Sequence, residues 1–267
     1  MDLGIAGRTA LICGASRGIG SAIADALGNE GCRLLLIGRG ADALAAKAGE
    51  LAERGVEVAV ETGDMNDLTF YTRAAARAAD RFGPVDIAIF NGFSPPPGGA
   101  LEVSAVDFER AHHQLVICFA ALVAAVAPAM RCRRWGRIVT IGSNVARQPF
   151  RTEQDTAYVL ANTARIAALG LSKTFANELA VDGITVNTIL TGAIATETAM
   201  SWAAARAAEM ETTPDAFIAR FIGERVPMRR MGLPVEIASL AAFLCSDHAG
   251  YTTGDSILCD GGVVAGV

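Results

Sequence analysis

The chain has 267 residues, of which 52% are hydrophobic and 19% are charged, and its net charge at pH 7 is -5. The high apolar content excludes an intrinsically disordered protein. The acidic balance argues against a nucleic-acid partner, because few cations are available to neutralise a run of phosphates. The charged fraction is below the ~25% typical of soluble domains. We therefore expect much of the surface to be buried, either on both faces of a sheet or between subunits.

The sequence gives no sign of secretion or of a membrane span. Residues 1–13 lack a basic start that leads into a long apolar run. The longest uncharged stretch, Leu115 to Met130, contains Pro128 and is shorter than the ~18 residues expected of a span. Cysteines are scattered without a metal-binding spacing, at Cys13, Cys32, Cys118, Cys132, Cys245 and Cys259. We expect a cytoplasmic protein that has neither a metal site nor a membrane partner.

Short apolar runs alternate with longer, alanine-rich segments along the chain. The short runs predict strands at Thr9–Cys13, Arg33–Ile37, Val56–Val60, Val85–Phe90, Arg137–Ile141, Ile184–Leu190 and Ser256–Cys259. The longer segments predict helices at Gly18–Asn29, Asp42–Arg54, Asp67–Phe82, Ser104–Arg133, Asp155–Val181 and Pro234–Ser246. This alternation is typical of repeated βαβ units, so we predict an α/β fold whose parallel sheet is covered on both faces. No linker interrupts the pattern, and we predict one domain over residues 1–267.

Two segments depart from this alternation. Ser94–Gly99 is a loop by its turn residues, and Thr191–Leu233 is too long for a plain connection. Both would lie beyond the carboxyl ends of the strands, where ligands bind in such sheets. We expect residues 191–233 to cover the substrate. Its large apolar residues indicate an apolar or extended substrate such as an acyl thioester, or simply lid helices packed on the body: Met200, Trp202, Met210, Phe217, Phe221 and Met228.

A glycine-rich run, Gly14–Gly20, directly follows the first predicted strand and opens a helix. Glycines let the backbone approach a pyrophosphate closely, and a helix N-terminus offers free N–H groups and the positive end of a dipole. A tight strand-to-helix turn also uses glycines. The run by itself therefore fits either a dinucleotide site or a plain turn.

The spacing of Gly14, Gly18 and Gly20 resembles the short-chain dehydrogenase/reductase family, especially its members similar to 3-oxoacyl-carrier-protein reductases. Further matches extend the likeness over nearly the whole chain: Gly63-Asp64, Asp86–Asn91, Gly136–Val139, Gly183–Asn187, Thr253-Gly254 and Asp260–Gly262. The resemblance implies a Rossmann-type, doubly wound sheet of seven parallel strands that binds a nicotinamide dinucleotide. The cofactor contacts that it implies fall on Gly14, Ser16, Arg17, Gly18, Ile19, Gly20, Arg39, Asp64, Asn91, Gly92, Arg165 and Thr196.

The end of the second strand bears on the choice of nicotinamide cofactor. Members of the family that use NAD(H) have an acid there for the ribose hydroxyls, whereas this chain has Ile37-Gly38-Arg39. Two guanidinium groups, those of Arg39 and Arg17, would suit a 2′-phosphate, although Arg39 also fits a solvated start of a helix. We predict NADP(H) in preference to NAD(H).

The catalytic set of the family is only partly present. That set is a Ser after the fifth strand, a Tyr and a Lys four residues apart on the next helix, and an Asn on the preceding helix. Ser143 matches the Ser. Counting back without a gap from Gly170–Lys173 and Gly183–Asn187 places Ala161 at the Tyr position and Arg165 at the Lys position.

An alternative register places Tyr158 at the Tyr position and Asn162 at the Lys position, but it needs three extra residues inside a helix. We prefer the gapless register, in which Tyr158 lies one turn before Ala161. Tyr158 is then either a displaced catalytic acid or a tyrosine that packs in a loop.

The Asn of the family is also replaced, because Leu115 stands at its position. The preceding His112, His113 and Gln114 face different directions on a helix, and structural roles are more typical of such residues than catalytic ones. Phe93 stands where the family has the glycine of an Asn-Ala-Gly triplet.

Three interpretations follow. The first is an NADP(H)-dependent oxidoreductase for a carbonyl or secondary alcohol, with a site rebuilt around Ser143, Tyr158 and Arg165. The second is a lyase or hydratase that uses Ser143 and Arg165, or a cofactor-binding protein without turnover. The third resembles the halohydrin dehalogenases, which pair Ser and Tyr with Arg. That group has lost its nucleotide pocket, so we rank it last.

Two helical stretches, Leu115–Ala129 and Ala161–Ala180, are more apolar than one covered sheet face needs. In the family these helices form one subunit interface, and the strand at Ser256–Cys259 helps to form another. We predict a homotetramer or a homodimer that acts on a small-molecule substrate and binds no nucleic acid.

Overall fold

A computed structural model describes residues 2–149 and 158–266. Its seven strands form one sheet in the order β3-β2-β1-β4-β5-β6-β7, and every neighbouring pair is parallel. The strands are β1 (Thr9–Cys13), β2 (Arg33–Gly38), β3 (Val58–Thr62), β4 (Ile87–Phe90), β5 (Gly136–Ser143), β6 (Ile184–Thr191) and β7 (Ser256–Cys259). The predicted doubly wound, seven-stranded Rossmann-type sheet in a single domain is confirmed.

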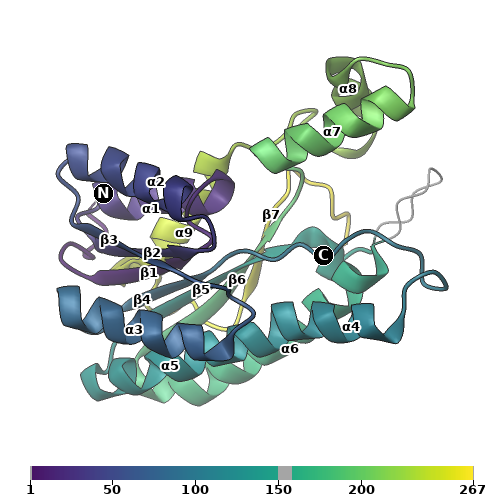
Figure 1. Cartoon of the computed structure of the whole chain (residues 1–267). Coiled ribbons are helices and arrows are strands. Elements are labelled where there is room, and N and C mark those ends of the chain that lie inside the picture. The colour runs from purple at the N-terminus through teal and green to yellow at the C-terminus, as the bar shows by residue number, and fades with distance from the viewer. Residues whose placement is uncertain (1, 150–157, 267) are drawn as a thin grey trace.

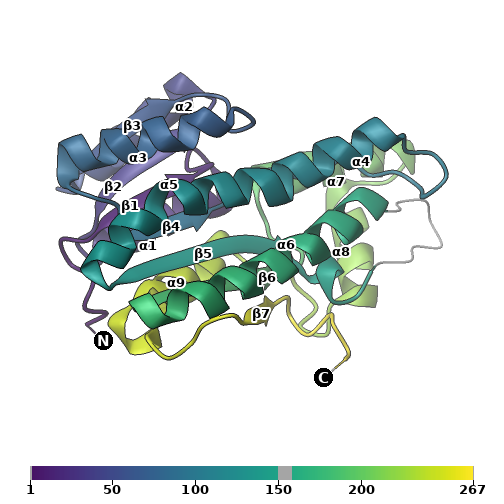
Figure 2. The same cartoon turned by 90° about the horizontal axis from the view of Figure 1, so that it is seen from below.

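Helices cover both faces of the sheet (Figure 1). One layer contains α1 (Gly18–Asn29), α2 (Ala41–Glu53) and α9 (Pro234–Cys245), and the other contains α3 (Leu68–Phe82), α5 (Cys118–Arg133) and α6 (Val159–Leu179). Figure 2 shows α5 and α6 running side by side under β4, β5 and β6. The strand residues between the layers are buried on both sides of the pleat, as in Leu34–Ile37, where none is exposed. This double burial explains why the strands are continuous apolar runs.

Several element boundaries differ from those expected, most of them by one or two residues. β3 begins at Val58 rather than Val56, because Val56 packs against Gly28 of α1 instead of pairing in the sheet. β4 begins two residues later than predicted, at Ile87. The predicted helix Ser104–Arg133 divides into α4 (Ala105–His112), the wider turn η1 (His113–Ile117) and α5. The predicted helix Asp155–Val181 is α6, followed by the 3-10 turn η3 (Ala180–Asp182), and its expected start at Asp155 lies outside the described residues.

The helical run Ala105–Arg133 is long and apolar enough to cross a membrane, judged by length and composition alone. It is longer than the uncharged stretch within it because α4 and α5 join through η1. In the structure, Phe119, Leu122 and Val126 of this run are buried in the core cluster beneath the sheet. The run therefore serves as a core helix of the fold.

Residues 191–233, which we call the lid, form a helical hairpin of α7 (Glu197–Glu209) and α8 (Pro214–Arg225). Its neck is closed by two backbone hydrogen bonds of 2.9 Å, from Ala195 N to Gly232 O and from Gly232 N to Ala193 O. Figure 1 shows the hairpin extending from the body at the carboxyl end of the sheet. The remaining short turns are η2 (Asn144–Ala146) and η4 (Asp247–Ala249).

Candidate active site

The glycine-rich loop after β1 forms a cradle at the start of α1. Gly14 and Gly18 have φ angles of +62° and +57°, which favour glycine. A Cβ on Gly20 would overlap the carbonyl oxygen of Gly14. Helix α1 begins at Gly18 without a side-chain cap from Arg17, so the N–H groups of its first turn remain available to an anion. This geometry fits the pyrophosphate of a dinucleotide.

Asn91, at the end of β4, braces this cradle. Its Nδ2 donates to the carbonyl oxygens of Cys13 and Gly14, both at 3.3 Å. A Cβ on Gly14 would lie 2.8 Å from the backbone oxygen of Asn91. The amide thus fixes the loop after β1 against the neighbouring strand, as expected for a residue beside the cofactor. Gly92 follows it and is exposed, whereas Ser16 and Ile19 in the loop are partly buried.

Arg17 and Arg39 lie after the adjacent strands β1 and β2, and both side chains are exposed. Neither has a carboxylate within 4.0 Å among the described residues. Asp64, after β3, accepts hydrogen bonds from the Asn66 backbone N and Nδ2 at 3.0 and 2.8 Å. These bonds lower the pKa of Asp64, and the charge of Arg39 lowers it further. The predicted adenosine-binding residues therefore each follow a strand at the carboxyl end of the sheet, after β1, β2 and β3.

The two polar residues of η1 turn toward this same loop rather than toward Arg165. His113 Nε2 lies 2.9 Å from the Asn66 backbone oxygen, and Gln114 Nε2 donates to Asn66 Oδ1 at 3.3 Å. Both side chains thus join α4–α5 to the loop after β3, which supports a structural role. No group of three His, Cys, Asp or Glu side chains within the described ranges could hold a metal ion.

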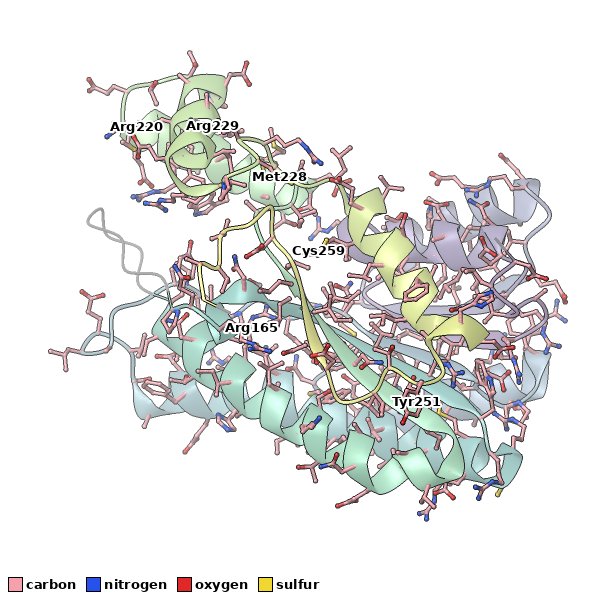
Figure 3. All side chains as sticks on the ribbon, turned by 180° about the vertical axis from the view of Figure 1, so that it is seen from behind. Arg165, Arg220, Met228, Arg229, Tyr251 and Cys259 are labelled. Atoms are coloured by element: carbon pink, nitrogen blue, oxygen red, sulfur yellow. The ribbon has the colours of Figure 1, made fainter. Side chains whose placement is uncertain are left out.

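Arg165 places a partly buried cation at the ends of β4 and β5. Its Nη1 and Nη2 donate long hydrogen bonds of 3.5 Å to the carbonyl oxygens of Ile141 and Phe93. No carboxylate pairs with it in the part of the chain that the structure describes. Burial lowers the pKa of Arg165 to about 10, so the group is still protonated at neutral pH. In Figure 3 the side chain lies on α6 at the end of the sheet that faces the lid.

Ala161 and Leu115 are the residues that the register of the sequence assigns to the Tyr and Asn positions of the family. Ala161 lies one turn before Arg165 on α6 and is 8% exposed. Leu115 lines a small cavity together with Arg165 and Thr140. Neither residue can donate or accept a hydrogen bond through its side chain.

Ser143 is the last residue of β5 and pairs in register with Thr191 of β6. Its Oγ accepts a hydrogen bond of 3.5 Å from Val145 N, at the start of η2. The adjacent Asn144 is buried, and its Nδ2 donates to Asp260 Oδ2 at 3.4 Å. Asn144 and Asp260 were not singled out as site residues from the sequence, although Asp260 falls in a stretch that matched the family.

Tyr158 stands at the N-terminus of α6, where Val159 N donates to Gly98 O at 3.4 Å. Burial raises the pKa of Tyr158, and the charges of Arg225 and Arg206 on the lid partly oppose this rise. In the described ranges, no hydrogen bond joins Tyr158 to Ser143 or Arg165. The three catalytic candidates are therefore not linked into one network.

Thr196 connects the lid to the nucleotide cradle. Its Oγ1 accepts from Ala199 N at 3.2 Å and so caps α7. Its methyl group would lie 3.2 Å from a Cβ on Gly18. The start of the lid therefore lies beside the glycine loop, and the contact of Thr196 with a cofactor stays a prediction.

Comparison with known proteins agrees with this geometry. Residues 14–264 match the family model described as enoyl-(acyl carrier protein) reductase. Oxidoreductase UcpA of Escherichia coli strain K12 is 34% identical over 260 residues, covering 97% of this chain and 95% of that protein. The 3-oxoacyl-[acyl-carrier-protein] reductase FabG of Vibrio cholerae is 29% identical over 261 residues, covering 98% and 99%.

Among solved structures, L-sorbose reductase from Gluconobacter frateurii, in complex with NADPH and L-sorbose, matches with a TM-score of 0.95. The two sequences are 29% identical, and the match covers 100% of each chain. The fold, the glycine cradle and these full-length relatives agree with one another. The chain belongs to the short-chain dehydrogenase/reductase family of oxidoreductases.

Proposed function

We propose that this protein is an NADP(H)-dependent oxidoreductase that interconverts a carbonyl group and a secondary alcohol on an apolar or acyl-type substrate. The observation that carries the proposal is the combination of a dinucleotide cradle at Gly14–Gly20 with the partly buried cation of Arg165, both at the carboxyl end of the sheet. The sorbose reductase complex, which contains NADPH, supports the choice of cofactor.

The residues that would hold the cofactor follow the cradle from one strand to the next. The first turn of α1 would bind the pyrophosphate, and the exposed guanidinium groups of Arg17 and Arg39 would bind the 2′-phosphate. Asp64 would contact the adenine, and Asn91 would lie beside the cofactor. When bound, NADP(H) supplies or accepts the hydride.

Three side chains act at the reacting centre in this proposal. Ser143 Oγ donates a hydrogen bond to the reacting carbonyl oxygen, and Arg165 orients the ribose and stabilises negative charge that develops nearby. Tyr158 Oη gives its proton to the carbonyl oxygen during reduction and recovers one from water afterwards. Because burial raises the pKa of Tyr158, the phenol is protonated at neutral pH, which suits reduction better than oxidation.

Replacing Arg165 with Met is expected to lower kcat for reduction by about 10- to 100-fold, the effect of losing one hydrogen bond to a charged group. Arg165→Lys keeps the charge and is expected to recover part of this loss. Steady-state kinetics with NADPH in excess measure both variants. Equal kcat in Arg165→Met and the parent protein would contradict a role at the reacting centre.

The surface supports assembly through two patches. Ile117 and Ile166, beside α5 and α6, are 43% and 50% exposed, and Phe243, Tyr251 and Leu258, around α9 and β7, are 41%, 101% and 37% exposed. Exposed apolar patches of this kind mark contact surfaces. We expect light scattering to give the mass of four chains, or of two, and a monomeric mass would contradict the proposal.

A second candidate is a non-redox lyase or hydratase, or a cofactor-binding protein without turnover. It is favoured by the apolar side chains of Ala161 and Leu115, which leave the family positions without a proton donor. NADPH oxidation measured against a panel of ketones, aldehydes and acyl thioesters separates the two. Tight binding of NADPH without turnover of any carbonyl would favour the second candidate.

A further inference from the structure

The lid carries several arginines, and Arg225 differs from the others in its contacts. Three have carboxylate partners on the lid or on α9: Arg206 with Glu209, Arg220 with Glu224 and Arg230 with Glu236. Arg229 donates to the backbone oxygen of Gly223 at 3.2 Å. Arg225 is half-buried, and no carboxylate lies within 4.0 Å of it in residues 2–149 and 158–266.

Arg225 is nevertheless held in place by an aromatic ring. Its guanidinium carbon lies 4.5 Å from the centre of the Phe221 ring. Stacking on an aromatic face orients a guanidinium and leaves its N–H groups free to bind another partner. Arg225 is thus a positioned cation whose charge is not neutralised by the described residues.

The C-terminal loop connects the end of α8 to the end of β5. A Cβ on Gly261 would lie 2.8 Å from a methyl group of Val226, the residue after Arg225. The preceding residue, Asp260, accepts the hydrogen bond from Asn144, which directly follows the serine of β5. The end of α8 is therefore linked through one loop to Asn144, the neighbour of Ser143.

The apolar part of the lid is an aromatic cluster next to Arg225. The rings of Trp202 and Phe217 lie 5.6 Å apart, those of Trp202 and Phe221 also 5.6 Å, and those of Phe217 and Phe221 5.9 Å. All three side chains are partly buried. Such a cluster offers apolar surface to a ligand directly beside a fixed cation.

We propose that Arg225 binds a carboxylate of the substrate, so that the substrate is an oxo acid with an apolar body, or the matching hydroxy acid. One guanidinium that has no carboxylate partner among the described residues matches the single charge and planar fork of a carboxylate better than a dianionic phosphate. The loop that contacts Val226 also binds Asn144, next to Ser143, which the proposed function places at the carbonyl. The carboxylate is therefore expected on the lid side of that carbonyl. This inference rests on the proposed function for the position of the carbonyl.

Calorimetric titration of the protein loaded with NADP⁺ tests the inference without turnover. The ligands are phenylpyruvate and benzoylacetate, each compared with its methyl ester, and phenyl phosphate. We expect both acids to bind more tightly than their esters and more tightly than phenyl phosphate. Arg225→Gln should weaken binding of the acids by about 10- to 100-fold, the cost of losing a hydrogen bond to a charged group, and leave ester binding unchanged. Arg225→Lys should recover part of the loss.

Arg220→Gln is the matched control, because Arg220 lies on the same helix in an exposed pair with Glu224 (Figure 3) and should leave acid binding unchanged. Equal affinities for acid and ester in the parent protein would overturn the inference, and that comparison needs no variant. An Arg225→Gln protein that binds the acids as the parent does would also overturn it. Failure to oxidise NADPH with any carbonyl would instead overturn the proposed function and leave the binding preference intact.

Discussion

Tyr158→Phe is expected to lower kcat for carbonyl reduction by about 10²- to 10⁴-fold, the usual contribution of a positioned general acid. The substitution removes only the hydroxyl group, so packing at the start of α6 and affinity for NADPH should not change. Steady-state kinetics together with fluorescence titration of NADPH measure the two effects separately. Tyr251→Phe is the control, because Tyr251 is fully exposed near β7.

The pH dependence of carbonyl reduction by the parent protein gives a second test of Tyr158 as the proton donor. Burial raises its pKa above the ordinary value of a tyrosine, so the proton that reduction requires is present throughout the neutral range and is lost only as the pH rises through that raised pKa. Reduction should therefore be independent of this group at neutral pH and decline only in strong alkali. Full activity in Tyr158→Phe would show that Tyr158 only packs in its loop and that the proton comes from elsewhere.

The double substitution Arg17→Ala and Arg39→Ala is expected to weaken NADPH binding by about 10²- to 10⁴-fold, because each guanidinium contributes about 10- to 100-fold as a hydrogen bond to a charged phosphate. NADH lacks the 2′-phosphate, so its affinity should stay the same. Fluorescence titration with each cofactor gives the two dissociation constants, and so the ratio of the affinities for NADPH and NADH.

Arg81→Ala is the control for this pair of substitutions. Arg81 lies in the last turn of α3, and its guanidinium is 5.7 Å from the centre of the Phe82 ring. Removing it lowers the positive charge of the protein without touching the cradle. A parent protein that binds NADPH and NADH equally well would contradict the role given to Arg17 and Arg39.

The sequence predicts the sheet well because its strands are buried on both faces. Leu34–Ile37 is apolar without alternation, and this pattern leaves few alternatives to a central parallel strand. The edge strand β3 is less fully buried, and its start was misplaced at Val56. The turn η1 could not be predicted from the hydrophobic pattern of the helix that contains it. A single wider turn keeps nearly the same side chains buried, so the pattern does not change there.

Some residues of the candidate site could likewise be found from the sequence, whereas others could not. Gly14, Gly18 and Gly20 were found from the sequence because a left-handed φ or a close contact leaves glycine as the suitable residue. The position of Arg165 followed from counting along one helix. Arg225 could not be found this way, because its place depends on how α8 docks on Gly261, a contact between segments distant in the chain.

The central claim, that hydride passes between NADP(H) and a carbonyl at a site that lacks the Tyr and Lys of its family, is tested most directly by isotope transfer. NADPH carrying deuterium at the reactive carbon of the nicotinamide is mixed with the protein and a panel of oxo acids and ketones, and the products are analysed by mass spectrometry. We predict that deuterium appears on the carbinol carbon of at least one product and that the transfer is slowed in Tyr158→Phe and in Arg165→Met. Tight binding of NADPH with no deuterium in any product would contradict the claim.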